Sequence, residues 1–293
     1  MQITFVSIII PTYNDWHRLS LCLAALANQS YPKEAFEVIV INNNSKDSMP
    51  DGFSLPEGYI VITENKPGSY AARNAGIRIA KGEIIGFTDS DCLPDVDWIQ
   101  NAVLHFQANK ILRRIAGKIQ VFSKTPKVTT AEKYDKLYAF RQQRYVAESG
   151  TCVTANMFSY KSVFEAVGLF NEDQLSWGDL NWGTKAYKAG YPIDYADNVI
   201  VNHPARSWRE LVKKEKRLAG GIALLERDKK PISIFRFLNE YRPRLAEIKF
   251  VYRNGTHLDT FDKIKILFMR HYLLGIRALE RFKVQRGKIP NRA

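Results

Sequence analysis

Two aspartates one residue apart are the first pair in the sequence with a clear chemical use. Asp89 and Asp91 follow the apolar run 84–88, which is typical of a buried strand. Carboxylates at this spacing can converge on a hard divalent cation, which keeps other coordination positions for substrate phosphates. The same residue types cap helices and form turns, so a purely structural role stays open for this pair.

A second candidate site is the loop 65–68 together with the helix that follows it. This helix is rich in small residues and carries Arg73 near its start. The amide groups of a helix N-terminus and an arginine together suit an anionic ligand. An ordinary helix start would show the same residues, and that alternative also stays open.

A third group surrounds Asp179, which lies between two tryptophans at the predicted start of a helix. A partly desolvated aspartate can act as a general base, and Trp177 and Trp182 could stack on the sugar of an acceptor. Alternatively, Asp179 caps the helix and both tryptophans belong to the core. His203 follows a short strand and could either ligate a metal or satisfy a hydrogen bond in the core.

The hydrophobic pattern indicates which elements position these side chains. Apolar runs alternate with segments in which apolar residues recur at helical spacing. This alternation predicts an α/β fold with a mostly parallel sheet covered by helices on both faces. In such a sheet the ligand site lies at the carboxyl ends of the strands, where the polar clusters fall. The expected strands span 5–10, 38–41, 59–63, 84–88 and 199–201, and the expected helices span 15–28, 69–80, 129–146, 162–167 and 179–189.

The composition excludes several classes of protein. The chain has 293 residues, of which 45% are hydrophobic, so it can form a core and is not a disordered chain. Three scattered cysteines argue against a disulfide scaffold, and no Cys/His cluster suggests zinc. The N-terminus lacks a basic segment and a cleavage site, and no apolar stretch approaches the ~18 residues of a spanning helix. We therefore expect a cytoplasmic protein.

The positive charge is concentrated in the last third of the chain. Residues 204–293 contain 23 Lys and Arg against 9 Asp and Glu, a net charge of +14, whereas the whole chain carries +13. This region is predicted to be helical from residue 207 onward, with apolar residues interleaved between Lys263 and Lys283. Such helices could lie on an anionic membrane surface, or their apolar residues could pack back onto the rest of the protein. We expect no nucleic-acid partner, because no nucleic-acid-binding module is recognisable.

Taken together, these segments resemble the family 2 inverting glycosyltransferases, which have the Rossmann-like GT-A fold of nucleotide-sugar transferases. Four motifs carry the resemblance, in the order in which the family has them, over about residues 1–205. They are the first strand and loop at 6–14, the Ala-Arg-Asn-Ala-Gly segment at 72–76, the metal-binding segment at 87–94 with Trp98 after it, and Gly178-Asp179.

The resemblance implies roles for the matching positions. Asp179 would be the base that removes the proton of the acceptor hydroxyl. Asp89 and Asp91 would serve a divalent cation, Mn²⁺ or Mg²⁺, and the ribose or diphosphate, and His203 would complete the metal shell. The residues expected to contact the nucleotide sugar are Pro11, Tyr13, Asn42, Arg73 and Asp89.

The sequence departs from the family pattern at two places. The family usually has Asp at the end of the second strand, where this chain has Asn42, and an amide can accept a hydrogen bond there only without charge. Two positions after the base the family usually has another acidic residue, and further on an arginine; here these are Asn181 and Lys185. A non-catalytic relative that binds a nucleotide sugar therefore remains an alternative to an enzyme.

The resemblance predicts a metal-dependent, inverting glycosyltransferase of the hexosyltransferase type. It would move a sugar from a nucleoside-diphosphate sugar to a hydroxyl of a saccharide or lipid-linked acceptor, in polysaccharide or glycolipid biosynthesis. We expect a GT-A domain at 1–205, divided into a nucleotide-sugar half at about 1–120 and an acceptor half at about 121–205. A basic helical region at 206–293 would follow, peripheral on the cytoplasmic face of a membrane.

Overall fold

The computed structural model describes residues 3–226 and 245–290 and divides the chain into two compact units. The first unit comprises residues 1–120, 140–173 and 178–203. The second comprises residues 121–139, 174–177 and 204–293. Segments from the middle of the chain therefore belong to the same unit as the basic C-terminal helices.

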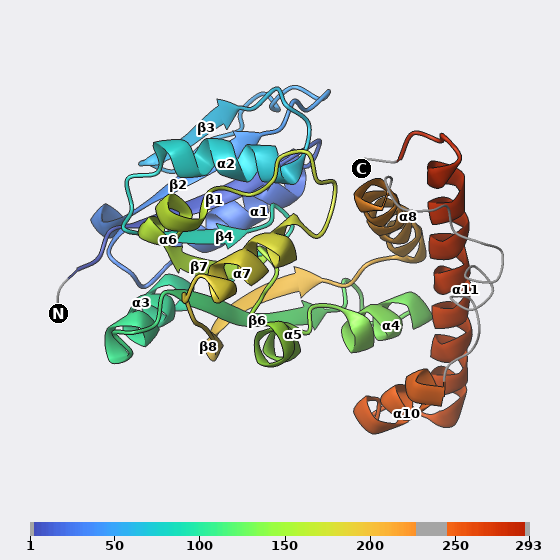
Figure 1. The fold of residues 1–293 in the computed structure, drawn as a ribbon. Helices are drawn as coiled ribbons and strands as arrows, with labels where there is room; N and C mark the ends of the chain where they lie inside the picture. Colours follow the sequence, from blue (N-terminus) through green and yellow to red (C-terminus); the bar gives the residue numbers. More distant parts are fainter. Residues whose placement is uncertain (1–2, 227–244, 291–293) are drawn as a thin grey trace. The chain divides into compact units, whose positions relative to one another are not determined.

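An eight-stranded mixed sheet forms the centre of the first unit, with the strand order β3-β2-β1-β4-β7-β6-β8-β5 (Figure 1). The pairs β3–β2, β2–β1 and β1–β4 are parallel, whereas β4–β7, β7–β6 and β8–β5 are antiparallel. The predicted α/β fold is confirmed, and its parallel part is the N-terminal half of the sheet. The strands are β1 (Val6–Thr12), β2 (Phe36–Asn42), β3 (Tyr59–Thr63), β4 (Ile84–Thr88), β5 (Leu93–Pro94), β6 (Arg114–Phe122), β7 (Asn156–Tyr160) and β8 (Ile193–Pro204).

Helices cover both faces of this sheet, as the continuous apolar strands predict. In β1, Ile8 and Ile10 pack into one apolar cluster with α1 and α3, and Ile9 packs into the other with α2, α6 and α7. Figure 1 shows α2 and α7 in front of the sheet and the fainter α1 behind it. The helices are α1 (Trp16–Ala27), the short η1 (Lys33–Ala35), α2 (Ser69–Ile79), α3 (Trp98–Ala108), α5 (Gln142–Ser149), α6 (Lys161–Val167) and α7 (Gly178–Lys188).

The single helix expected at 129–146 is two helices, α4 (Thr130–Tyr138) and α5. The chain turns at Phe140, whose φ of +50° is incompatible with a continuous helix. The strand expected at 199–201 is also longer, because β8 begins at Ile193. Helix α4 belongs to the second unit and α5 to the first, so the break between the two helices is also a boundary between the two units.

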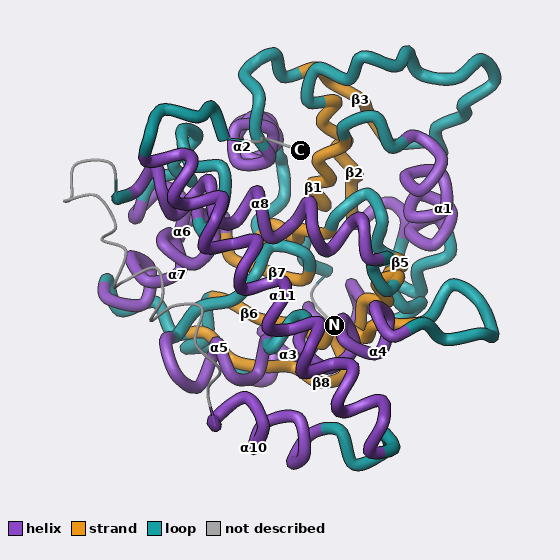
Figure 2. Tube along the Cα trace, turned by 90° about the vertical axis from the view of Figure 1, so that its right-hand side faces the viewer, coloured by secondary structure: helices purple, strands orange, loops and turns teal. Residues whose placement is uncertain are grey.

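In the second unit, four helices of the described residues surround an apolar cluster of their own, which includes Tyr134, Leu211, Ile266 and Leu273. The long α11 packs against α8, α10 and α4 (Figure 2). Among the described residues, no helix combines the length and the apolarity that crossing a membrane requires. These helices are α4, α8 (Trp208–Leu225), α10 (Leu245–Asn254) and α11 (Thr260–Gln285).

Candidate active site

The predicted binding residues of the first half lie at the carboxyl ends of the parallel strands. Pro11 and Asn42 are in the last two residue pairs of the β1–β2 ladder, where Pro11 pairs with Ile41 and Asn42 pairs with Thr12. Pro11 is tolerated in this central strand because the pairing with β4 ends at Ile9. The parallel register therefore brings these residues to one edge of the sheet.

The loops that follow β1 and β2 hold each other through asparagine side chains. Asn14 has a φ of +50°, and its Oδ1 accepts a hydrogen bond of 2.7 Å from the Lys46 amide. Asn42 Oδ1 accepts a hydrogen bond of 3.0 Å from the Ser45 amide, so the predicted base-binding oxygen also supports its own loop. Tyr13, in the loop after β1, is 42% exposed and can face a ligand.

Asn43 is a structural residue of this edge that the sequence reasoning missed. Its Oδ1 accepts a hydrogen bond of 2.6 Å from the Gly68 amide, and its Nδ2 donates to the carbonyls of Glu64 and Lys66. Gly68 has a φ of +133° directly before α2, a conformation that side chains disfavour. The asparagine thus fixes where α2 begins.

Arg73 and Asp89 form an ion pair between α2 and the loop after β4. The Arg73 Nη2 donates to Asp89 Oδ1, and its Nη1 donates to the carbonyl of Ser69 at 3.3 Å. Arg73 is only 4% exposed, whereas a third of the Asp89 side chain is accessible to solvent. The pair therefore places a buried positive charge behind a carboxylate that a ligand can reach.

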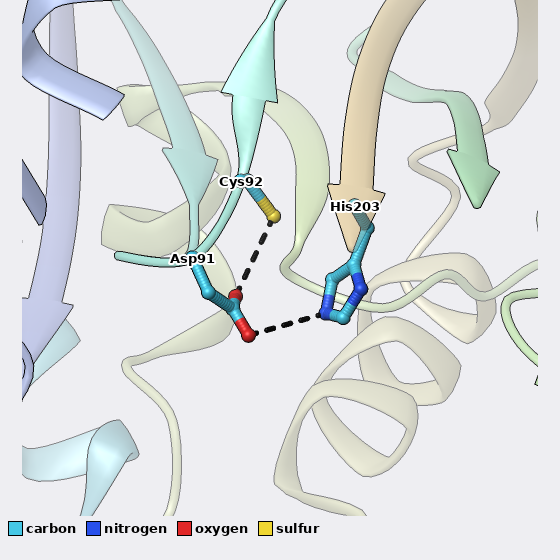
Figure 3. Close-up of side chains that lie close together, drawn as sticks. All are labelled: Asp91, Cys92 and His203. Atoms are coloured by element: carbon cyan, nitrogen blue, oxygen red, sulfur yellow. Dashed lines mark hydrogen bonds and ion pairs between the residues drawn. The ribbon is translucent and has the colours of Figure 1, made fainter. Parts of the chain in front are cut away.

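Asp91, one of the predicted metal ligands, lies beside His203 at the end of β8 (Figure 3). Asp91 Oδ2 lies 3.4 Å from Nε2 of His203, whose ring is 1% exposed and packs on Phe140 at 4.6 Å between centroids. Cys92 Sγ lies 3.9 Å from Asp91 Oδ1, and the three ligand atoms are within 4.8 Å of one another. Asp89 is not a member of this cluster, since its carboxylate faces Arg73.

The donor set of this cluster fits a divalent cation. A carboxylate oxygen and an imidazole nitrogen are ligands that Mn²⁺ accepts, and solvent reaches the partly exposed Asp91. Burial raises the pKa of the Cys92 thiol well above its ordinary value, so the sulfur is a weak ligand in its protonated form. The oxygen and nitrogen donors would therefore dominate at this position.

Arg18 is a second residue that the sequence reasoning did not identify. Its Nη1 lies 3.5 Å from Asp91 Oδ2, and its Nε donates to Asp15 Oδ1 at 2.7 Å. Ser90 Oγ in turn donates to Asp15 Oδ2 at 2.9 Å. Through these contacts α1 adds a positive charge beside the aspartates that follow β4.

Asp179 lies in the first turn of α7 and is held by groups from two helices. Its Oδ1 accepts a hydrogen bond of 3.0 Å from the Tyr70 hydroxyl and one of 2.9 Å from the Leu180 amide. Burial raises the pKa of the Asp179 carboxyl, and the charge of Arg73 and these two donors oppose the rise. Asp179 is partly exposed as a residue, and burial makes its carboxyl more basic than an ordinary aspartate.

One turn of α2 links the two carboxylates that the motifs predicted. Tyr70 and Arg73 are three residues apart and therefore lie on the same face of the helix. Tyr70 contacts Asp179, and Arg73 contacts Asp89. Residues far apart in the sequence are thereby gathered around one helix end.

The two tryptophans differ in their surroundings. Trp182 is 2% exposed, stacks on Phe164 at 4.3 Å between centroids and donates its indole hydrogen to the Gly168 carbonyl. This corrects the expectation that Trp182 stacks on the acceptor sugar, since its ring is covered by protein. Trp177 belongs to the second unit, has a φ of +69° and buries its indole nitrogen without a hydrogen-bond partner among the described residues.

Known proteins with similar sequences are glycosyltransferases. A family model described as Glycosyl transferase family 2 matches residues 7–168. Glycosyltransferase AglE of Haloferax volcanii is 35% identical over 222 residues, which cover 74% of this chain and 72% of the relative. A dolichyl N-acetyl-alpha-D-glucosaminyl phosphate 3-beta-D-2,3-diacetamido-2,3-dideoxy-beta-D-glucuronosyltransferase of Methanococcus voltae is 25% identical over 217 residues, 69% of this chain and 68% of the relative.

Solved structures share the fold at lower sequence identity. The mannosyltransferase PcManGT from Pyrobaculum calidifontis, in complex with GDP-Man and Mn²⁺, aligns with a TM-score of 0.61 and 19% identity over 97% of this chain and 87% of that one. S. aureus TarS 1–349, in complex with UDP-GlcNAc, aligns with a TM-score of 0.55 and 15% identity over 97% and 92%. The fold is therefore the GT-A fold of these enzymes. Because the family model spans more than half of the chain, the protein belongs to glycosyl transferase family 2 and is a glycosyltransferase.

Proposed function

We propose that the protein is a metal-dependent, inverting enzyme that transfers a sugar from a nucleoside-diphosphate sugar to a hydroxyl of a saccharide or lipid-linked acceptor. The observation that carries this proposal is the pairing of Asp179 and Asp89 with one turn of α2. Helix α2 then holds both Asp179, the base for the acceptor, and Asp89, the carboxylate for the donor, through side chains that are one turn apart. Such an enzyme would serve polysaccharide or glycolipid synthesis.

The donor would bind at the carboxyl ends of β1, β2 and β4. Pro11, Tyr13 and Asn42 would border the nucleoside, and Arg73 with Asp89 would lie at the ribose or diphosphate. The positive charges of Arg73 and Arg18 favour a diphosphate at this edge. The PcManGT complex with GDP-Man and Mn²⁺ supports a donor of this class on the same fold.

Asp91 and His203 would hold the divalent cation, Mn²⁺ or Mg²⁺, with Asp89 nearby in sequence. A bound cation of this kind neutralises the charge of a departing diphosphate. Asp91 faces both His203 and Arg18, so its carboxylate is already oriented by two neighbours. The contact with Arg18 orients the Asp91 carboxylate and so favours a defined ligand position.

Asp179 would accept the proton of the acceptor hydroxyl. The oxygen then forms a bond to the anomeric carbon while the bond from that carbon to the diphosphate oxygen breaks, and the electron pair leaves with the diphosphate. A single displacement of this kind inverts the configuration of the anomeric carbon. General-base assistance contributes about 10²–10⁴-fold to such a step.

The test is the variant Asp179→Asn, which keeps the shape of the side chain and removes its basicity. We expect turnover of the nucleotide sugar with Mn²⁺ to fall about 10²–10⁴-fold while donor affinity stays the same. The exposed Asp197 of β8 offers a matched control, and Asp197→Asn should retain full turnover. Unchanged turnover in Asp179→Asn would show that another group is the base.

We further propose that the second unit binds the surface of an anionic membrane through α11. Phe261, Phe268, Tyr272 and Leu279 recur at helical spacing and are exposed, Phe268 to 73%. The opposite face of the same helix contributes Ile266 and other residues to the core of the unit. An amphipathic helix with exposed aromatic rings is typical of an interfacial segment.

Charge on the same face supports an anionic surface as the partner. Lys265, Lys283 and Arg286 are exposed near the aromatic residues of α11, and the Lys265 Nζ lies 4.0 Å from the centre of the Phe261 ring. Each basic residue near an anionic lipid surface contributes about 1 kcal/mol. The face therefore combines apolar insertion with electrostatic attraction.

Sedimentation with liposomes tests this membrane contact. We expect binding to vesicles with anionic lipid, little binding to neutral vesicles, and release at high salt. The combined change Phe261→Ser, Phe268→Ser should abolish binding, whereas Leu21→Ser, Leu104→Ser, at exposed apolar positions of the first unit, should not. Equal partitioning to both lipid types, or equal loss in both double variants, would contradict the assignment to α11.

A further inference from the structure

Tyr70 and Gly178 form a contact that the family motifs do not explain. The Tyr70 hydroxyl donates to Asp179 Oδ1 at 3.0 Å, and the residue is 5% exposed. Its ring packs on Phe170 at 5.7 Å between centroids and lies 5.9 Å from the Arg73 guanidinium carbon. The ring is therefore fixed on several sides, and the hydroxyl has little freedom to turn away from the carboxylate.

Gly178 provides the space for this ring. A Cβ atom at Gly178 would lie 2.7 Å from Cε2 of Tyr70 and 2.8 Å and 2.9 Å from two further ring atoms. The glycine does not have a positive φ, so the backbone conformation does not require it. Alanine normally stabilises a helix more than glycine does. A glycine in the first turn of α7 therefore points to a steric demand at this position.

We infer that Tyr70 is a positioning residue for the Asp179 carboxylate and that Gly178 is the residue that admits its ring. The inference rests on the proposed function of Asp179 as the base. The hydroxyl donor holds Oδ1 in place and stabilises the ionised carboxylate. This donor therefore opposes the rise in the pKa of Asp179 that burial causes.

The electrostatic surroundings of Asp179 come from several elements. Arg73 and Tyr70 face it from α2, Tyr145 faces it from α5, and Cys152 lies in the segment before β7. Of these groups, Tyr70 is the one with a side-chain hydrogen bond to the carboxylate among the described residues. Removing its hydroxyl should therefore change the ionisation of the base without removing any formal charge.

The experiment is the pH profile of kcat for Tyr70→Phe with saturating donor and Mn²⁺. Losing a hydrogen bond to the charged form raises the pKa of the base, so the acidic limb should move to higher pH by about one unit. The donor KM should stay within about twofold. Tyr59→Phe is the matched control, because its buried hydroxyl has no hydrogen-bond partner among the described residues, and its limb should not move.

Gly178→Ala gives an independent measurement. The new methyl group must displace the ring of Tyr70, so this variant should shift the limb in the same direction as Tyr70→Phe. The double variant should show no further shift, because both changes remove the same hydrogen bond. Additive shifts would contradict the role of Gly178, and circular dichroism checks that each variant is folded.

The outcomes separate this inference from the proposed function. If Asp179→Asn abolishes turnover but the limb of Tyr70→Phe coincides with that of the wild type, Tyr70 has no positioning role and the base assignment stands. If Asp179→Asn is fully active, or the wild type turns over no nucleotide sugar, the proposed function fails and the inference fails with it. A shifted limb in Tyr70→Phe and Gly178→Ala, with Tyr59→Phe unchanged, supports it.

Discussion

Removing the charge of Glu172 should have a pH-dependent effect on stability. Its Oε1 accepts hydrogen bonds from Asn74 at 3.0 Å and from Arg78 at 2.7 Å, and its Oε2 lies 3.2 Å from Lys66 Nζ. These partners belong to α2 or to the loop that enters it, so Glu172 fastens the helix that carries Tyr70. The perturbation is Glu172→Gln, which keeps the size and removes the charge.

The magnitude follows from these contacts. The Asn74 hydrogen bond, together with Arg78 and Lys66, lowers the pKa of Glu172 to about 2 against the opposing effect of burial. Arg78 and Lys66 are about half exposed, so solvent screens their share. We therefore expect Glu172→Gln to lower the free energy of unfolding by about 1–2 kcal/mol at pH 7.

The sign of the pH dependence is fixed by the direction of the shift. A carboxylate with a lowered pKa in the folded state stabilises the protein above the pKa of the unfolded chain, about 4.5. That contribution is lost as the pH falls from about 4.5 towards 2. The difference between the wild type and Glu172→Gln should therefore be full at pH 7 and clearly smaller at pH 3.

Urea unfolding at the two pH values measures the effect. Glu148→Gln is the control, because Glu148 pairs with Arg144 four residues away on α5 and both side chains are more than half exposed. It should change the free energy of unfolding by less than about 0.5 kcal/mol at either pH. A difference for Glu172→Gln that is the same at pH 7 and pH 3, or no larger than that of Glu148→Gln, would refute the reasoning.

Three further predictions follow from buried or clustered side chains. His203→Ala should weaken the Mn²⁺-dependent binding of a nucleoside diphosphate at least tenfold in a calorimetric titration. Cys92→Ala should change this binding less than about threefold, because hard cations prefer oxygen and nitrogen to a buried thiol. Asn156→Ala should lower the free energy of unfolding by about 3 kcal/mol in urea, because it removes the hydrogen bonds of the Asn156 side chain to the Trp98 indole and to the carbonyls of Lys118 and Val199; a loss below about 1 kcal/mol would contradict this. Arg114→Lys should cost about 2 kcal/mol in the same assay, since a lysine cannot reach the three carbonyls that the buried guanidinium satisfies; an unchanged midpoint would show that these bonds contribute little.

The first half of the fold could be predicted because its information is local. Buried parallel strands appear as continuous apolar runs, and the expected runs 38–41 and 84–88 lie within or coincide with β2 and β4. The second half could not be predicted as well. The break between α4 and α5 depends on a positive φ at Phe140, and nothing in the residue type demands that conformation.

In the site, too, residues in strand-end motifs could be predicted, whereas residues that act through long-range contacts could not. The family resemblance predicted Asp89, Asp91 and His203 as metal ligands, and the structure places Asp91 and His203 3.4 Å apart. Arg18 and Tyr70 were missed, because each acquires its role only through a contact with a residue far away in the chain. A basic residue in an amphipathic helix and a tyrosine in another carry no local signal of such a contact.

By itself, the sequence determined the α/β class and which strands end in polar residues, because hydrophobic periodicity and strand-end residues are local properties. The tertiary structure alone decided which side chains are covered and which meet. It buries Trp182, for which the sequence left both a core and a surface position open, and it separates the covered Ile266 from the exposed Phe268 of one helix. It also places the Tyr70 hydroxyl on Asp179. Burial and partnership depend on elements that pack together from distant parts of the chain, and no window of sequence contains them.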